Sequence, residues 1–162
     1  MFDKKAIVVA ANPYKHYHVS DTLPPTKDLG DVEVHREHRT RYGKVFWDII
    51  PPGRLDTPWK HPEINTGYFY VSKCGMAKYR MSIEYIRQWK DIDRERTRDC
   101  IPQCRRSYLE SDRDTLTYYA ILIGELEQLR SFRELREFTL VSTKKPVERV
   151  QNYVIVYDPG YR

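Results

Sequence analysis

The chain has 162 residues, 31% of them charged, and a mean hydropathy of -0.72, so we expect one soluble domain over residues 1–162 with a core of its own. Its apolar runs fall short of the ~18 residues that cross a bilayer, and no signal-peptide pattern opens it, which argues against a membrane protein and for a cytoplasmic one. A formal net charge of +5 favours an acidic partner, foremost nucleic acid, although a solvated surface rich in Arg and Lys explains it equally well.

The first predicted element is a short β-strand over residues 5–11, which Asn12 and a following proline end as a turn. An aromatic and His-containing patch comes next and includes Tyr14 and Tyr17; an ordinary loop explains these residues as well. Residues 19–31 show no periodicity and are predicted to be loop.

Residues 32–42 are strongly polar, and their cations include Arg36, Arg39 and Arg41. One interpretation is an arm that contacts phosphates. The other is a mixed-charge surface segment, because glutamates at two positions dilute the basic charge. His35 and His38 lie three residues apart in the same segment, but no third metal ligand is evident near them.

The central stretch, residues 43–86, has the strongest strand signals. We predict strands over 44–50, 66–72 and 79–86, and the last of them alternates, with Tyr79, Met81, Ile83 and Tyr85 on one face. The loop over 51–62 carries Trp59 between two prolines, which restrict the backbone and favour a preorganised ring wall.

The C-terminal half adds two more strands, over about 116–126 and 150–157. Ser131 with Glu134 three residues later forms a capping-box pattern, which predicts a short helix over 131–138. About six strands and two or three short helices, without a βαβ repeat, predict an α+β domain whose mixed sheet curls into an open pseudo-barrel.

Catalytic motifs are missing from this sequence: it has no P-loop, no nucleophile elbow, no His-Glu-x-x-His and no zinc-ribbon spacing. Three cysteines do not form a disulfide framework, and Cys100-x-x-x-Cys104 lacks the tight spacing of a zinc site. We therefore expect no cofactor, no metal and no enzyme activity. A small metal-dependent nuclease that uses His35, His38, Asp48 or Asp56 remains an alternative.

Aromatic residues interleaved with Arg and Lys are the remaining signal, because rings stack on bases while cations hold phosphates. At least half of these rings are expected to belong to the core. The candidates are Trp47, Trp59, Tyr14, Tyr17, Tyr68 and Tyr70.

The order of elements resembles the EVE and YTH branch of the PUA-like superfamily, and more narrowly the N-terminal target-reading domains of archaeal McrB-type restriction GTPases. The likeness is carried by the Val-Ala-Ala-Asn-Pro strand end, Gly43-x-Val-x-Trp47, Gly-Tyr-Phe-Tyr-Val-Ser-Lys73, Ile-Glu-Tyr-Ile86, Tyr-Tyr-Ala-Ile-Leu-Ile123 and Leu-Arg-Glu-Phe138. It implies a pocket for a flipped, often methylated base. Trp47 would be a wall of that pocket, Asn12 would face the base, and Trp59 would form a second wall.

The resulting hypothesis is a reader of DNA with a modified base, the targeting module of a restriction system whose AAA+ GTPase domain lies outside this chain. Its base-binding residues would be Asn12, Trp47, Trp59, Tyr14 and Tyr68, and its phosphate-binding residues Arg39, Arg41, Lys44 and Arg54. An RNA-binding PUA-like module and a domain that contacts only protein are the alternatives to it.

Overall fold

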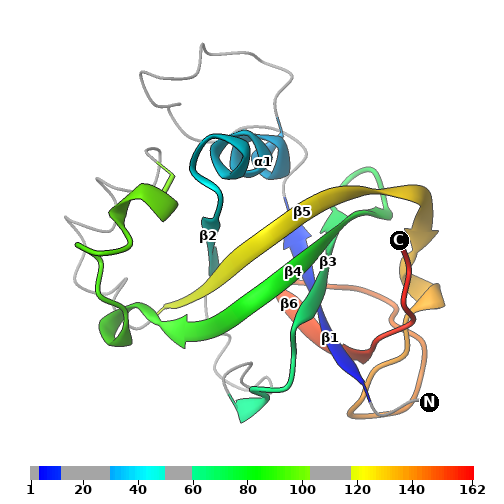
Figure 1. Cartoon of the computed structure of the whole chain (residues 1–162). Coiled ribbons are helices and arrows are strands. Elements are labelled where there is room, and N and C mark those ends of the chain that lie inside the picture. Colours follow the sequence, from blue (N-terminus) through cyan, green and yellow to red (C-terminus); the bar gives the residue numbers. More distant parts are fainter. Residues whose placement is uncertain (1–3, 12–29, 50–59, 103–117) are drawn as a thin grey trace.

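A computed structural model describes residues 4–11, 30–49, 60–102 and 118–162. Within these ranges, six strands form one mixed sheet in the order β2-β5-β4-β3-β1-β6, which curls into a half-barrel (Figure 1). The strands are β1 (Lys5–Ala11), β2 (Val45–Ile49), β3 (Thr66–Val71), β4 (Met76–Gln88), β5 (Tyr119–Glu134) and β6 (Tyr153–Tyr157). The helices are α1 (Asp31–Tyr42) and the 3-10 turns η2 (Trp89–Asp91), η3 (Arg98–Cys100) and η5 (Leu135–Glu137). The predicted curled α+β sheet is therefore confirmed.

Sheet pairing explains the mixed character. β1 runs parallel to β3 and antiparallel to β6, while the pairs β2–β5, β5–β4 and β4–β3 are antiparallel. The long β4–β5 pair carries register shifts on both sides of Ile83, and such bulges bend strands and increase their twist. This bending lets β2 approach β3 across the interior, where the ring centroids of Trp47 and Phe69 are 4.4 Å apart.

These bulges also overturn one prediction. Met81 and Ile83 point into the barrel interior as expected, but Tyr85 packs on the outer face beside Phe46 and Trp89. A strict period of two places all of these residues on one face; each extra bulge residue moves the following side chain to the other face.

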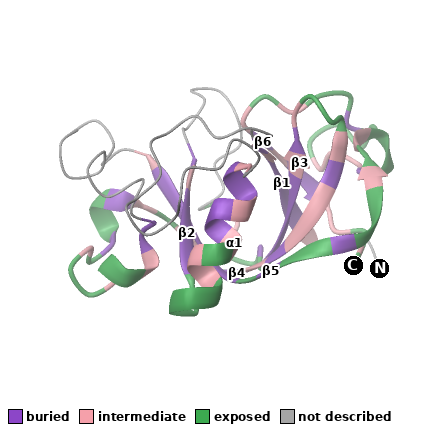
Figure 2. Ribbon diagram, turned by 90° about the horizontal axis from the view of Figure 1, so that it is seen from above, coloured by how far each residue is buried: buried purple, intermediate pink, exposed green. Residues whose placement is uncertain are grey.

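Buried residues form three clusters. One fills the barrel interior around Phe69, a second lies outside β3 and β1 around Tyr68 and Phe138, and a third lies outside β2 and β5 around Trp89. α1 packs against β2 and β5 at one end of the sheet, and Figure 2 shows buried segments of α1 beside those strands. Among the described residues, no helix is long and apolar enough to cross a membrane.

Two segments adopt a local structure that their patterns do not predict. The polar segment 32–42, for which the pattern predicts neither helix nor strand, forms α1. The helix predicted over residues 131–138 is wrong, because β5 continues through Glu134 and only η5 follows. A capping box is present, but Glu134 and Glu137 form it in place of Ser131 and Glu134.

Candidate nucleic-acid interface

The end of α1 gathers the predicted phosphate-binding cations. Gly43 ends the helix at a φ of 89°, in the left-handed region that favours glycine, and its N–H donates to the Arg39 carbonyl at 2.7 Å. Arg39 and Arg41 lie in the last turn, where cations complement the negative end of the helix dipole. Lys44 follows directly, so one short stretch presents three cations, which we call the basic patch: Arg39, Arg41 and Lys44.

Arg39 is held in place by the sheet. Its Nε donates a 2.8 Å hydrogen bond to the carbonyl oxygen of Gly124, one residue past the last β2–β5 pair. The Nε bond fixes the plane of the guanidinium and leaves its two Nη groups as further donors. Arg39 is therefore oriented in advance of any ligand.

Lys44 and Arg41 are more open. The Lys44 Nζ lies 3.6 Å from the Glu84 carboxylate, and both side chains are roughly half exposed. Glu84 borders Gly124, since a Cβ on that glycine would come within 2.7 Å of Glu84 Oε1. Lys44 and Arg39 thus reach the same part of the β4–β5 surface. Arg41 is exposed and forms no ion pair with a described residue.

Arg36 lies on the same helix as the basic patch, but its contacts tie it to the fold. Its guanidinium binds the Glu33 carboxylate at 3.0 Å, donates to the Leu126 carbonyl at 3.4 Å and covers the Tyr79 ring. The Tyr79 hydroxyl donates to Glu33 at 2.6 Å, and burial together with that carboxylate raises the Tyr79 pKa. Arg36 is thus committed to the fold, unlike Arg41.

Trp47 lies in the core. Its side chain is only 4% exposed, with the His35 ring on one side and the Phe69 ring on another, each with its centroid at 4.4 Å. The His35 Nδ1 donates to the Asp31 carbonyl at 2.8 Å, which fixes this ring in the stack. The expectation of a pocket wall is thus corrected here: in this structure Trp47 offers no open ring face to a base.

Tyr68 is likewise committed to packing. It is 0% exposed, its ring packs on Phe138, and its hydroxyl donates to Asp158 at 2.7 Å. Burial and this carboxylate raise the Tyr68 pKa. Tyr68 faces the outer cluster because it alternates with Phe69 along β3, so its expected contact with a base is not available in this arrangement.

Four predicted site residues, Asn12, Tyr14, Arg54 and Trp59, lie outside the described residues. Among the described residues nearby, Lys5 at the start of β1 contacts His61 at 3.4 Å and Glu63 at 3.3 Å.

The residues of the nuclease alternative do not converge. His35 faces Trp47, while His38 stacks on Tyr42 and its Nε2 lies 2.6 Å from the Asp99 carbonyl. Asp48 is half-buried on β2, and Asp56 lies outside the described residues. No group of three His, Cys, Asp or Glu side chains suited to a metal ion occurs in the described part of the chain.

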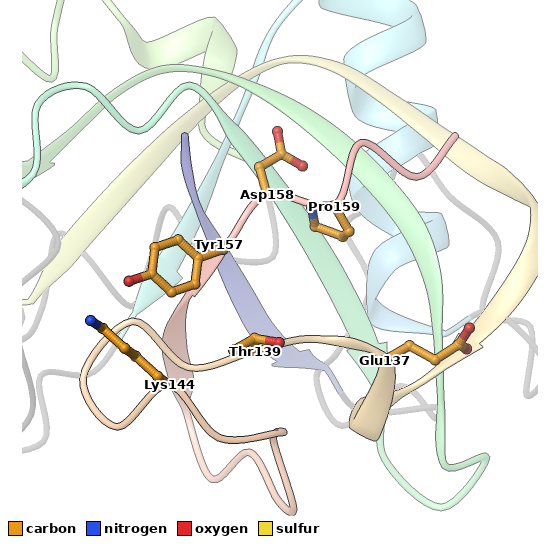
Figure 3. A pocket seen from close by; sticks show the side chains of 6 residues that line it. All are labelled: Glu137, Thr139, Lys144, Tyr157, Asp158 and Pro159. Carbon is orange, nitrogen blue, oxygen red and sulfur yellow. The ribbon is translucent and has the colours of Figure 1, made fainter. Parts of the chain in front are cut away.

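Sequence reasoning missed a pocket of about 480 Å³ next to the end of β6. Figure 3 shows its lining side chains, which come from the 137–144 segment and from the strand end: Glu137, Thr139, Lys144, Tyr157, Asp158 and Pro159. The Asp-Pro-Gly turn after β6 was the only signal near it, and a turn alone does not indicate a pocket.

No protein-family model, curated protein or solved structure matches the chain. The likeness to PUA-like domains therefore stays a prediction carried by the motifs of this sequence. The fold and the positions of the side chains are what support a function.

Proposed function

We propose that this chain is a nucleic-acid-binding domain, with no catalytic role of its own, and that the basic patch holds phosphates. The observation that carries the proposal is the Arg39–Gly124 hydrogen bond, which orients a guanidinium on the part of the β4–β5 surface that Lys44 also reaches. A fixed, planar donor set matches a phosphate oxygen pair, and Lys44 and Arg41 add positive charge at the same end of α1.

The proposal extends to DNA with a modified base, read as the targeting module of a larger restriction protein with a GTPase domain. The resemblance to PUA-like readers and the curled sheet support this finer statement. A base would have to enter next to residues beyond the described part of the chain, or Trp47 would have to be uncovered first. Extrusion of a base costs a few kcal/mol, so base contacts must recover that cost.

Binding to duplexes and its salt dependence test the proposal. We expect the double variant Arg41→Gln/Lys44→Gln to bind a fluorescent duplex more weakly and to lower the slope of log K against log salt by about two, since each phosphate contact contributes roughly 0.9. The matched control Lys145→Gln/Arg149→Gln removes two exposed cations elsewhere and should bind like the unchanged chain. Equal affinity of the two variants would refute a phosphate role for the patch.

Competition experiments address the finer statement. Duplexes with methylated adenine or cytosine should compete better than the same unmodified duplexes. An RNA of the same sequence should compete less well; the reverse order would favour an RNA-binding module, because 2′-hydroxyl contacts select RNA.

A further inference from the structure

The pocket at the end of β6 is built from a tight turn and a fixed carboxylate. Lys144 adopts a left-handed backbone with φ of 59°, which is uncommon for a residue other than glycine. The turn is closed by two backbone hydrogen bonds of 2.9 Å, from Lys144 N–H to the Leu140 carbonyl and from Leu140 N–H to the Lys145 carbonyl. The turn therefore fixes the point from which the Lys144 side chain extends.

The two acidic side chains of the pocket already accept most of their hydrogen bonds from described residues. Both Glu137 oxygens accept hydrogen bonds, one from the Arg133 guanidinium at 3.3 Å and one from the Glu134 N–H at 2.7 Å. Asp158 Oδ1 accepts from the Tyr68 hydroxyl at 2.7 Å and from the Gly160 N–H at 2.8 Å. Asp158 Oδ2 has no donor among the described residues, so the pocket retains one acceptor.

The hydrogen-bond donors that line the pocket have no partner among the described residues. Among the described residues, the Lys144 ammonium forms no ion pair, and the side-chain hydroxyls of Thr139 and Tyr157 have no hydrogen-bond partner. Figure 3 shows the Lys144 ammonium and the Tyr157 hydroxyl pointing to the same side of the pocket, with Thr139 between them and Glu137. One ammonium and two hydroxyls suit an anionic group with several acceptor oxygens, such as a phosphate.

We infer that this pocket binds a nucleoside monophosphate, with its phosphate at Lys144 and its base against the Tyr157 and Pro159 rings. A pocket of about 480 Å³ is in the range of small-molecule sites. Asp158 Oδ2 would accept from an amino or hydroxyl group of the nucleoside, which a bare anion lacks. The inference does not rest on the basic patch, since Figure 1 shows the 137–144 segment, in orange, on another side of the sheet and away from α1.

Calorimetric titration of the full chain with each of the four 5′-monophosphates tests this inference. We expect saturable binding of at least one of them, and weaker binding of the corresponding nucleoside and of inorganic phosphate, because each supplies only part of the contacts. A 5′-phosphorylated oligonucleotide separates two sources of the ligand: competition with the monophosphate indicates a strand end, and its absence indicates a free nucleotide. No saturable binding of any monophosphate, or equal binding of nucleoside and nucleotide, would overturn the inference.

Variants locate the site. Lys144→Gln should weaken binding by about tenfold and Thr139→Val by about threefold, in keeping with the loss of a charged and of a neutral contact. Lys145→Gln is the matched control: the same charge is removed one residue away, outside the pocket lining, and affinity should be unchanged. An equal loss in both lysine variants would indicate charge attraction without a site. The Arg41→Gln/Lys44→Gln variant should keep monophosphate affinity, so this inference and the proposed function fail independently.

Discussion

The Arg39 guanidinium donates to the carbonyl of Gly124 at 2.8 Å, at the point where β2 stops pairing with β5. Two residues further along β5, the Leu126 carbonyl accepts from Arg36 at 3.4 Å. Strand edges with unpaired carbonyls invite pairing with other chains, and proteins cover them. Arg36 and Arg39 of α1 therefore both donate to carbonyls on this edge of β5, and Arg39 also belongs to the basic patch.

The Arg39–Gly124 contact predicts different effects for two arginines of one helix turn. Arg39→Met should lower the free energy of unfolding by about 1–2 kcal/mol, since it leaves a strand carbonyl without its charged donor. Arg41→Met should change stability by less than about 0.5 kcal/mol, as expected for an exposed site. Urea denaturation measures both. If the two variants are equally stable, the Gly124 contact contributes nothing to the fold.

Close packing between β3, β1 and β4 gives a second prediction. A Cβ on Gly67 would lie 2.5 Å from the Met81 Cε and 3.0 Å from an Ile7 methyl, so Gly67→Ala should cost about 1–3 kcal/mol through overpacking. Met81→Ala alone should cost about 2–5 kcal/mol, because it leaves a cavity. The double variant should cost less than the sum of the two, and denaturant unfolding of all three proteins measures this coupling. Additive costs would show that the backbone moves instead.

Periodicity found the strands because β1, β2, β3, β6 and the first part of β5 bury apolar residues at most positions, while β4 buries the alternating Met81 and Ile83. It could not find α1. That helix buries only two valines besides Asp31 and His35, so it lacks an apolar stripe, and its place is set by contacts with β2 and β5. Local sequence carries no record of such long-range contacts.

The site was predictable in composition but not in exposure. The structure puts Arg39 and Arg41 in the last turn of α1 and Lys44 directly after it, and Arg39 and Lys44 reach the same part of the β4–β5 surface. The sequence around Trp47 does not distinguish a buried ring from an exposed one. In the structure, the curl of the sheet brings Phe69 against the Trp47 ring, and α1 adds His35. Whether a ring on a strand is a pocket wall or core depends on the opposite strand, which a single pattern cannot indicate.

The hydrogen bond between the buried Tyr68 and the partly buried Asp158 predicts a dependence of stability on pH. Tyr68→Phe should lower the free energy of unfolding at neutral pH by about 1.5 kcal/mol, because it removes a hydrogen bond to a carboxylate. Burial and Asp158 raise the Tyr68 pKa above its usual 10.0, so above pH 10 the unfolded chain releases a proton that the folded protein keeps.

Stability should therefore be complete below pH 10 and fall as pH rises above it. Tyr68 contributes a slope of up to about 1.4 kcal/mol per pH unit, and this contribution should be missing in Tyr68→Phe. Tyr79→Phe should reduce the slope in the same way, since burial and Glu33 raise the Tyr79 pKa. Denaturant unfolding between pH 8 and pH 11 measures the slopes; identical slopes in all three proteins would show that neither tyrosine keeps its proton longer in the folded protein.

The covered ring of Trp47 gives a last prediction, which bears on how a base could be read. In protein labelled with 5-fluorotryptophan, the fluorine resonance missing in Trp47→Phe reports on this position. We expect that resonance to be unchanged between H2O and D2O and on addition of an unmodified or a methylated duplex, since His35 and Phe69 cover the indole and its side chain is 4% exposed. A resonance that moves with the methylated duplex alone would mean that the stack opens and that Trp47 contacts the base. An unmoved resonance beside salt-dependent binding would place base recognition elsewhere and leave Trp47 as core.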